Sequence, residues 1–296
     1  MGGNFTGRRR AAGALLAAGL VSGLISGCST PSQASSTAPS STASAPSAAP
    51  GSASPSATGQ GSAAGAGVDT AAAYRKWGIE PLAAPPAPPA KKPVTLRPGS
   101  DVPVISEIPT QDKVVFITVD DGAEKDPEFV TMMSELKIPF TMFLTDAAIS
   151  SDYGYFERLQ RLGNGVQNHT LTHPNLRTLG PAAQKREICG QQNRLKRHYG
   201  TTPRLFRPPY GNWNEGTRAA AKACGVEAIV LWRESMQIKN MQYQRGDRKL
   251  HPGDIILAHF RGPSDLKGRT MTEMTANMLR RIQEQGFTVA RLEDYL

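Results

Sequence analysis

VVFITVDDG, residues 114–122, is an apolar run rich in β-branched residues that ends in two adjacent aspartates and a glycine. Such a run predicts a buried β-strand. Successive side chains of a strand point to opposite faces, and adjacent carboxylates repel, so Asp120 and Asp121 form an unusual strand end. Gly122 permits a sharp turn, after which the two acids need not face opposite ways.

Outward from this run, short apolar stretches alternate with helix-like stretches to the end of the chain. The other strand-like runs cover the surroundings of Val166 and residues 140–145, 205–209, 227–232, 254–260 and 287–292. The helix-like stretches cover residues 127–136, 155–162, 181–198, 215–224 and 270–285. Strands that alternate with helices predict an α/β fold of parallel β/α units. About seven such strands favour a barrel or open barrel over a doubly wound sheet.

The chemically distinctive residues fall at the carboxyl ends of these strand-like runs. Asp120 and Asp121, Arg207 and His259 each lie at or just past such an end. In a β/α barrel these ends converge on one face, where active sites form. We therefore expect these side chains to share one site.

A histidine pair follows the short strand-like segment at Val166. In NHTLTHP, residues 168–174, His169 and His173 have the i, i+4 spacing that suits two imidazoles on one metal. Pro174 disfavours a helical conformation at His173, so we expect a tight loop. Such a pair alone is more often surface or capping histidines, but here a strand-end carboxylate is available. Two histidines and one carboxylate form the three-ligand arrangement of catalytic zinc, which would leave the second aspartate free as a general base.

Four motifs together resemble a known family. T-V-D-D-G (118–122), H-T-L-T-H-P (169–174), R-P-P-Y-G (207–211) and L-A-H (257–259) are similar, in this order, to the motifs of NodB-type polysaccharide deacetylases, carbohydrate esterase family 4. The resemblance covers residues 111–296. It implies a NodB-homology fold, a deformed (β/α) barrel with its active site at the carboxyl ends of the strands.

The resemblance also implies roles for the acids and the histidine pair. Asp120 would be the general base, and Asp121, His169 and His173 would bind a divalent metal. Zn²⁺ is the expected metal, with Co²⁺ or another divalent ion as the alternative. Water activated by the metal would attack the acetamide carbonyl after Asp120 takes its proton.

The remaining motif residues would complete the site. By the same resemblance Arg207 would hold and tune Asp120, and His259 would be the general acid that protonates the leaving amine. The backbone N–H of Tyr210 would stabilise the oxyanion, because neither proline before it has an N–H. Leu257 would line the acetyl pocket, and Trp232 would form a wall of the substrate groove.

One segment departs from the family pattern. After the strand-like run 227–232, family members carry aspartates, one of which orients and tunes the acidic histidine. This chain has W-R-E-S-M-Q-I-K there, with no aspartate. Glu234 is a possible substitute. Without a carboxylate partner His259 is less readily protonated, which puts its role as acid in doubt.

The first 110 residues have a different composition. Three arginines at positions 8–10 and a short apolar stretch predict a signal peptide, residues 1–27, too short for a spanning helix. The small residues before Cys28 resemble a bacterial lipobox, which implies lipidation; the alternative is an ordinary signal peptide with an incidental cysteine. Residues 28–110 are expected to be a disordered Ser/Ala/Pro-rich tether and a proline-rich lead-in, with one short helix around residues 74–77. The catalytic domain would then be residues 111–296.

The net charge of +9 divides unevenly along the chain. Residues 1–110 carry 8 basic and 4 acidic residues, and residues 111–296 carry 26 and 21, so the domain is only +5. Its basic residues are scattered and follow no nucleic-acid-binding pattern, so we expect no nucleic acid as partner. A mildly basic surface suits anionic cell-wall polymers.

Cysteine usage fits export. Cys189 and Cys224 are the two cysteines of the domain, and they are either a disulfide or two buried thiols. We expect a monomer, anchored by a lipid at Cys28 to the outer face of the cytoplasmic membrane.

The leading functional hypothesis is an extracytoplasmic, metal-dependent hydrolase that removes N-acetyl groups from a cell-wall or surface polysaccharide containing N-acetylglucosamine. One alternative is an O-acetyl esterase on acetylated xylan-type glycans, because ester cleavage needs less help from an acid. A further alternative is a non-catalytic glycan-binding lipoprotein, although a pure binder has no reason to retain Asp120.

Overall fold

The computed structural model describes residues 70–296 of the chain. The expected signal peptide, Cys28 and the tether up to residue 69 lie outside the described residues. Between residues 70 and 296, no helix is both long and apolar enough to cross a membrane.

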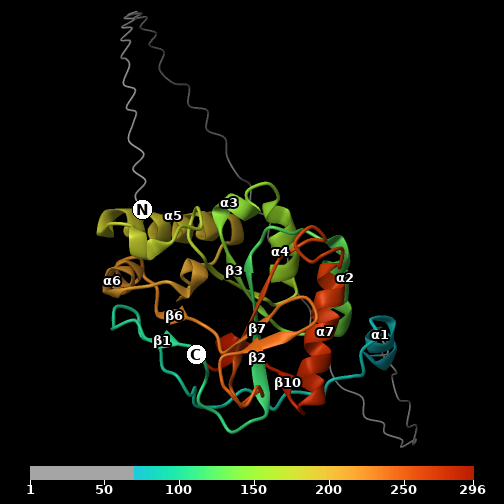
Figure 1. Cartoon of the computed structure of the whole chain (residues 1–296). Coiled ribbons are helices and arrows are strands. Elements are labelled where there is room, and N and C mark those ends of the chain that lie inside the picture. The colour runs from blue at the N-terminus through green and yellow to red at the C-terminus, as the bar shows by residue number, and fades with distance from the viewer. Residues whose placement is uncertain (1–69) are drawn as a thin grey trace, which may run out of the picture. The chain divides into compact units, whose positions relative to one another are not determined.

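The strands form one strongly curled, mostly parallel sheet, a half-barrel (Figure 1). In the described part of the chain they are β1 (Val104–Ile105), β2 (Val114–Asp121), β3 (Thr141–Leu144), β4 (Gly165–Asn168), β5 (Leu205–Phe206), β6 (Ala228–Val230), β7 (Glu234–Met236), β8 (Met241–Tyr243), β9 (Ile255–His259) and β10 (Thr288–Val289). Their order is β1-β6-β5-β4-β3-β2-β9-β7-β8, and β10 pairs with β2. Among the strands of residues 70–296, β7 and β8 are the pair that runs antiparallel. The predicted α/β fold is confirmed, and β2, β3, β4, β5, β6, β9 and β10 are the seven expected strands.

Helices cover the outside of the curled sheet. They are α1 (Thr70–Lys76), α2 (Pro127–Leu136), α3 (Asp146–Ile149), α4 (Tyr153–Arg161), α5 (Pro181–Tyr199), α6 (Glu215–Ala223) and α7 (Met271–Glu284), with short 3-10 turns η1 (Leu176–Thr178), η2 (Pro209–Gly211) and η3 (Leu292–Asp294). Capping side chains fix where several of these helices begin. The Asp126 side chain accepts a hydrogen bond from the N–H of Glu128 at the start of α2, and Thr270 forms a capping box with Glu273 at the start of α7.

The alternation of side chains along β2 divides the core into an outer and an inner part. The outer part, under α2, α4 and α7, contains Val115, Ile117 and Val119. The inner part contains Phe116, whose ring packs edge-on against Tyr295 at 4.9 Å between centroids. Because side chains alternate, Asp120 lies on the inner side of the strand, at its carboxyl end.

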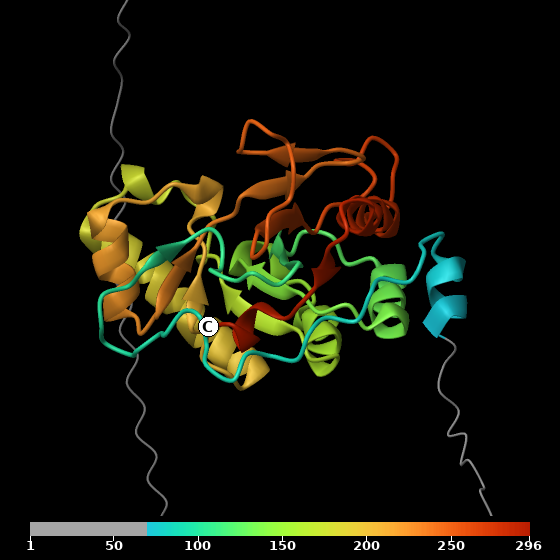
Figure 2. The ribbon, with the colours of Figure 1, turned by 90° about the horizontal axis from the view of Figure 1, so that it is seen from below.

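The folded part begins earlier than residue 111, where we expected it. Tyr74 of α1 is buried in the outer core, and Ile108 is buried in the inner core. Between them the chain runs across the end of the half-barrel opposite the carboxyl ends of its parallel strands, and β1 pairs with β6 (Figure 2). The proline-rich composition conceals this packing because isolated apolar residues, rather than a periodic pattern, make the contacts.

The two domain cysteines form a disulfide. Cys189 of α5 and Cys224, directly after α6, have Cα atoms 4.9 Å apart. The sequence alone did not decide between a disulfide and two free thiols, and the structure contains the disulfide. It ties together two helices that pack on the same side of the sheet.

Glu234 belongs to a buried charge cluster at the start of β9. Its side chain is fully buried, its Oε1 lies 3.6 Å from Nη1 of Arg245, and Arg245 also binds Asp254 at 2.7 Å. Burial and the adjacent Asp254 raise the pKa of Glu234 to about 9, although Arg245 opposes the shift. Glu234 is therefore protonated at neutral pH, and its hydroxyl is positioned to donate to Asp254.

This buried acid should make stability fall as pH rises. An unfolded glutamate ionises near pH 4.3, whereas folded Glu234 keeps its proton until about pH 9. The folded state thus binds the extra proton between these values, and stability is lost across that window by up to about 1.4 kcal/mol per pH unit. Replacing Glu234→Gln should remove this slope. Urea unfolding at pH 5, 7 and 9 would measure it, with exposed Glu128→Gln as the control. Parallel curves for wild type and Glu234→Gln would contradict the assignment.

Candidate active site

The two aspartates at the end of β2 are brought to one side by an unusual backbone. Asp121 has φ of 73° and Gly122 has φ of 94°, both in the left-handed region. A Cβ atom at Gly122 would lie 2.4 Å from Cγ2 of Ile149, so only glycine fits there. The sequence assigned the turn to Gly122 alone, but Asp121 itself leaves the strand conformation. Asp120 points into the half-barrel, and the turn directs Asp121 toward the same site.

The histidine pair lies on a tight loop after β4, as its proline predicts. Thr170 and His173 both have positive φ, of 72° and 58°. The N–H of Thr170 donates to Oδ1 of Asn168 at 2.8 Å, and the N–H of His173 donates to Oγ1 of Thr170 at 3.1 Å. These side-chain bonds stabilise a conformation that β-branched and aromatic residues rarely adopt.

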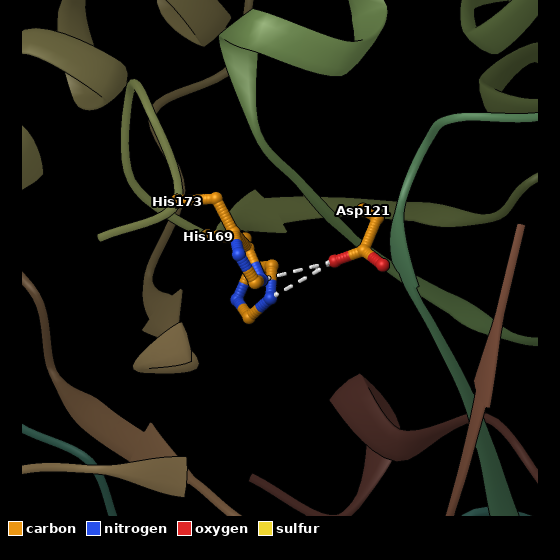
Figure 3. Close-up of side chains that lie close together, drawn as sticks. All are labelled: Asp121, His169 and His173. Carbon is orange, nitrogen blue, oxygen red and sulfur yellow. Dashed lines mark ion pairs between the residues drawn. The ribbon is translucent and has the colours of Figure 1, made fainter. Parts of the chain in front are cut away.

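The loop and the strand end place three potential metal ligands together. Oδ1 of Asp121 lies 3.2 Å from Nε2 of His173 and 3.4 Å from Nε2 of His169 (Figure 3). Nδ1 of His169 is 2.7 Å from the carbonyl oxygen of Arg207. A proton on Nδ1 donates to that carbonyl and leaves the Nε2 lone pair facing Asp121, the tautomer that a metal ligand requires.

The three side chains fit a divalent cation. Their ligand atoms all lie within 4.8 Å of one another. Oδ1 of Asp121 is buried and makes no well-formed hydrogen bond within residues 70–296, as suits an atom that binds a cation. One carboxylate and two imidazoles leave positions open for water and substrate, the arrangement of a catalytic zinc site.

Neighbouring charged side chains shift the pKa of Asp121 and that of His169. Burial raises the pKa of Asp121, but His169 and His173 outweigh it and hold that pKa far below its usual range. Burial lowers the pKa of His169, but the carboxylates of Asp120 and Asp121 outweigh it and raise that pKa. Asp121 and His169 therefore each favour the charged form of the other.

A fully buried arginine holds the second aspartate. Nη1 of Arg207 donates to Oδ1 of Asp120 at 2.6 Å and to Oγ1 of Thr118 at 2.8 Å. Its Nε and Nη2 donate to the carbonyl oxygens of Val230 and Leu231 at 2.9 and 3.0 Å. Burial lowers the pKa of Arg207, and Asp120 opposes that shift. The ion pair fixes Asp120 while its Oδ2 lies 3.7 Å from Nε2 of His169.

Two aromatic side chains flank this arrangement. Tyr210 has φ of 61° and is 63% exposed, and its ring lies edge-on to that of His173 at 4.8 Å. The Trp232 ring packs against the guanidinium of Arg207, with 5.5 Å between the ring centroid and Cζ of Arg207. A Cβ atom at Gly211 would lie 3.0 Å from the Trp232 ring, so glycine allows the close approach of the two segments. An exposed tyrosine on the rim and a tryptophan beside the ion pair suit the walls of a sugar-binding groove.

His259 ends β9 directly beside Asp120. The two residues are partners in the β2–β9 register, and Leu257 lies on the same inner face of β9. Burial lowers the pKa of His259, and Arg261 and His169 lower it further, against the pull of Asp120 and Asp121. Among the described residues its ring makes no hydrogen bond. His259, the residue that the resemblance assigns as the acid, therefore lies beside Asp120, and no carboxylate of residues 70–296 orients its ring by a hydrogen bond.

Glu234 does not take the place of that partner. It pairs with Ile256, whose side chain lies in the outer core, whereas His259 and Leu257 face inward. Register partners on neighbouring strands point to the same face of a sheet, so Glu234 points to the outer face, as Ile256 does. His259 points to the inner face. Its neighbours are Asp254 and Arg245 instead.

Two supporting residues were not identified from the sequence. Thr118 binds Arg207 from within an otherwise apolar strand, and Asn168 anchors the histidine loop. Asn168 is fully buried and also donates through Nδ2 to Oε1 of Gln192 at 2.9 Å. A polar residue inside an apolar run, and an amide directly before a histidine, are the signals that could have identified them.

Comparison with known proteins agrees with this geometry. The family described as polysaccharide deacetylase matches residues 107–229. An uncharacterized protein of Streptomyces coelicolor, SCO4760, is 44% identical over 195 residues, 66% of this chain and 77% of that protein. A chitooligosaccharide deacetylase of Bradyrhizobium sp. is 25% identical over 194 residues, 59% of this chain and 87% of that protein.

Solved structures share the fold. A family 4 carbohydrate esterase from Bacillus anthracis has a TM-score of 0.53 at 24% identity, and covers 65% of this chain and 86% of its own. A CE4 family pseudoenzyme from the same organism has a TM-score of 0.55 at 21% identity, and covers 66% and 69%. At these identities the similarity shows the fold alone. Together with the sequence matches, it shows that this chain belongs to the NodB-type polysaccharide deacetylases of carbohydrate esterase family 4.

Proposed function

We propose that the protein is a metal-dependent hydrolase that removes N-acetyl groups from a cell-wall or surface polysaccharide containing N-acetylglucosamine. The observation that carries this proposal is the pairing of Asp120 with fully buried Arg207 beside the three-ligand group. A metal site alone would need only Asp121 and the two histidines. The second carboxylate, held in place and close to His169, is what hydrolysis requires in addition.

The residues of the chain divide the reaction between them. Asp121, His169 and His173 would hold the divalent cation, expected to be Zn²⁺, which when bound polarises the acetyl carbonyl and lowers the pKa of water. Asp120 takes the proton of the attacking water, and Arg207 keeps its carboxylate oriented.

Residues on the other strand ends act on the substrate. The backbone N–H of Tyr210 stabilises the negative oxygen that forms on the acetyl carbon. His259 protonates the nitrogen as its bond to that carbon breaks, so acetate and a free amine are released. Leu257 lines the pocket for the acetyl methyl group. These roles are the ones that the resemblance to the family implies, and the position of each residue near the carboxyl end of its strand or turn is compatible with them.

A polysaccharide substrate is implied by the family. The similarity to a chitooligosaccharide deacetylase supports an N-acetylated glucosamine polymer in particular. The exposed ring of Tyr210 and the half-buried ring of Trp232 offer apolar faces on which sugar rings can stack.

O-acetyl ester hydrolysis is the second candidate, and His259 is the observation that favours it. Burial lowers its pKa, and it has no carboxylate partner among the described residues. An alkoxide leaves more easily than an unprotonated amine, so an ester substrate needs the acid less.

The proposal includes an extracytoplasmic location. A signal peptide and lipidation of Cys28 would anchor the domain to the outer face of the cytoplasmic membrane. The Cys189–Cys224 disulfide supports this location, because disulfides persist in oxidising compartments.

Acetate release should depend on a metal bound through Asp121. We expect activity on N-acetylglucosamine polymers, loss with a chelator and recovery with added Zn²⁺. Asp121→Asn should bind metal more weakly and recover part of its activity in excess metal. Metal content and acetate release, measured on N- and O-acetylated glycans, would test this. Activity that is unchanged by complete metal removal would contradict the assignment.

Asp120 should be needed for turnover and not for metal binding. Asp120→Asn removes the base but keeps a neutral isostere beside Arg207, so we expect normal metal content and turnover lower by about 10²–10⁴-fold. Thermal unfolding would check that the variant is folded. If Asp120→Asn were fully active and Asp121→Asn bound metal normally but were inactive, the two roles would be reversed.

His259 should matter more for amides than for esters. His259→Ala should retain metal, and its loss of turnover should be at least about tenfold larger on an N-acetyl than on an O-acetyl substrate, because only the amine must be protonated to leave. His251→Ala, in the segment that precedes β9, is the control. Equal losses on both substrates would argue against His259 as the acid. If the Asp120, Asp121 and His259 variants all match the wild type because none of the four proteins releases acetate, the glycan-binding alternative would be supported.

A further inference from the structure

A basic groove runs beside α7, on the outer side of the half-barrel. Two adjoining hollows, of about 350 and 440 Å³, share Lys239 and Arg269. The cations that line them are Lys76, Lys239, Lys267, Arg269 and Arg280, against a single carboxylate, that of Glu273. We call these residues, together with Trp77, Thr272 and Asn277, the basic groove.

Most of the positive charge in the groove is unpaired. Arg269 binds Glu273 at 3.0 Å, and Lys76 binds Glu135 at 2.6 Å. Lys239, Lys267 and Arg280 form no direct ion pair among residues 70–296, although the charge of Lys239 also lowers the pKa of Glu273. The groove therefore keeps an excess of positive charge around one concave surface, which attracts an anionic ligand.

The groove is also pre-organised. Arg280 is held by a hydrogen bond from Nε to the carbonyl oxygen of Gly78 at 2.9 Å, and from Nη1 to Oδ1 of Asn277 at 2.8 Å. Trp77 is half-buried, and its Nε1 donates to Oε2 of Glu135 at 2.7 Å. An aromatic ring fixed beside an amide and several cations suits a sugar that carries negative charge.

Segments far apart in the chain build this surface. Trp77 follows directly after α1, which lies next to α2 and α7 (Figure 2). Lys239 lies in the turn between β7 and β8, and Arg280 lies on α7. All residues of the basic groove lie outside residues 107–229, the part that the polysaccharide deacetylase family matches. None of the groove residues belongs to the candidate active site.

We propose that the basic groove binds an anionic glycan polymer of the cell envelope, through charge from phosphate or carboxylate groups and stacking on Trp77. The groove is concave, with an aromatic ring and an amide beside its cations, so it fits a chain of sugar-sized units better than the flat surface of a membrane. Such binding would retain the protein on a polymer that its active site does not process. The inference does not depend on the proposed hydrolase activity, but it rests on the proposed extracytoplasmic location.

Binding of soluble polymers to the full chain tests the proposal. The probes are polyglycerol phosphate, which carries phosphate without sugar rings, and polygalacturonate, which carries carboxylates on sugar rings. We expect both to bind at low salt and to weaken as salt screens the charges, and we expect neutral chitohexaose to leave the groove empty. Calorimetry would give the affinities.

Matched variants separate the groove from general charge. Lys239→Gln with Arg280→Gln should weaken both anionic polymers about tenfold or more. Trp77→Leu should weaken polygalacturonate more than polyglycerol phosphate, because only the former has rings to stack. The control pair Lys185→Gln with Arg186→Gln removes the same charge from exposed positions on α5. Turnover of a short neutral substrate should be unchanged in the groove variants.

Several outcomes would overturn the proposal. Equal loss of affinity in the groove pair and the α5 pair would mean attraction by net charge alone. Unchanged affinity in the folded groove pair, checked by circular dichroism, would place the binding elsewhere. Tight binding to anionic phospholipid vesicles with no binding to either polymer would point to a membrane surface instead.

Discussion

The site depends on one buried ion pair, between Arg207 and Asp120. Burying two charges is costly, and the cost is offset only where every hydrogen-bonding group finds a partner. Arg207 meets this condition through Asp120, Thr118 and two backbone carbonyls of the chain after β6. Its own carbonyl accepts from His169. One residue therefore sets the orientation of the base and the tautomer of a metal ligand, and breaking such a pair costs about 3–5 kcal/mol.

Backbone strain is concentrated around this ion pair. Asp121, Thr170, His173 and Tyr210 are four of the seven non-glycine residues with positive φ in the described part of the chain. Conformations of this kind cost of order 1–3 kcal/mol each and persist only where the surroundings impose them. Here Asn168 and rigid strand ends impose them. The result is a set of side chains from separate turns that converge on one point, which regular strands alone would not achieve.

The geometry of the sheet also determines which side chains lie away from the candidate active site. β7 places Glu234 on the outer face of the sheet. Its carboxyl group therefore joins Arg245 in a buried charge cluster and does not reach His259. His259 is left without an orienting acid among the described residues. The N-terminal segment closes the far end of the half-barrel and adds α1 beside α7, where the basic groove forms. The sheet thus separates the candidate active site, at the strand ends, from the basic groove on the outer surface.

The sequence by itself determined the α/β fold, seven of the ten strands in the described residues and the set of acids and histidines, because alternation of apolar runs and strand-end motifs are local signals. It could not determine that Asp121 leaves the strand conformation, that Cys189 and Cys224 pair, or that residues 70–110 belong to the fold. These depend on contacts between segments far apart in the chain: Gly122 against Ile149, α5 against α6, and Tyr74 against the outer core. The face on which Glu234 lies was likewise decided only by its register with Ile256, since a local sequence carries no record of its strand partner.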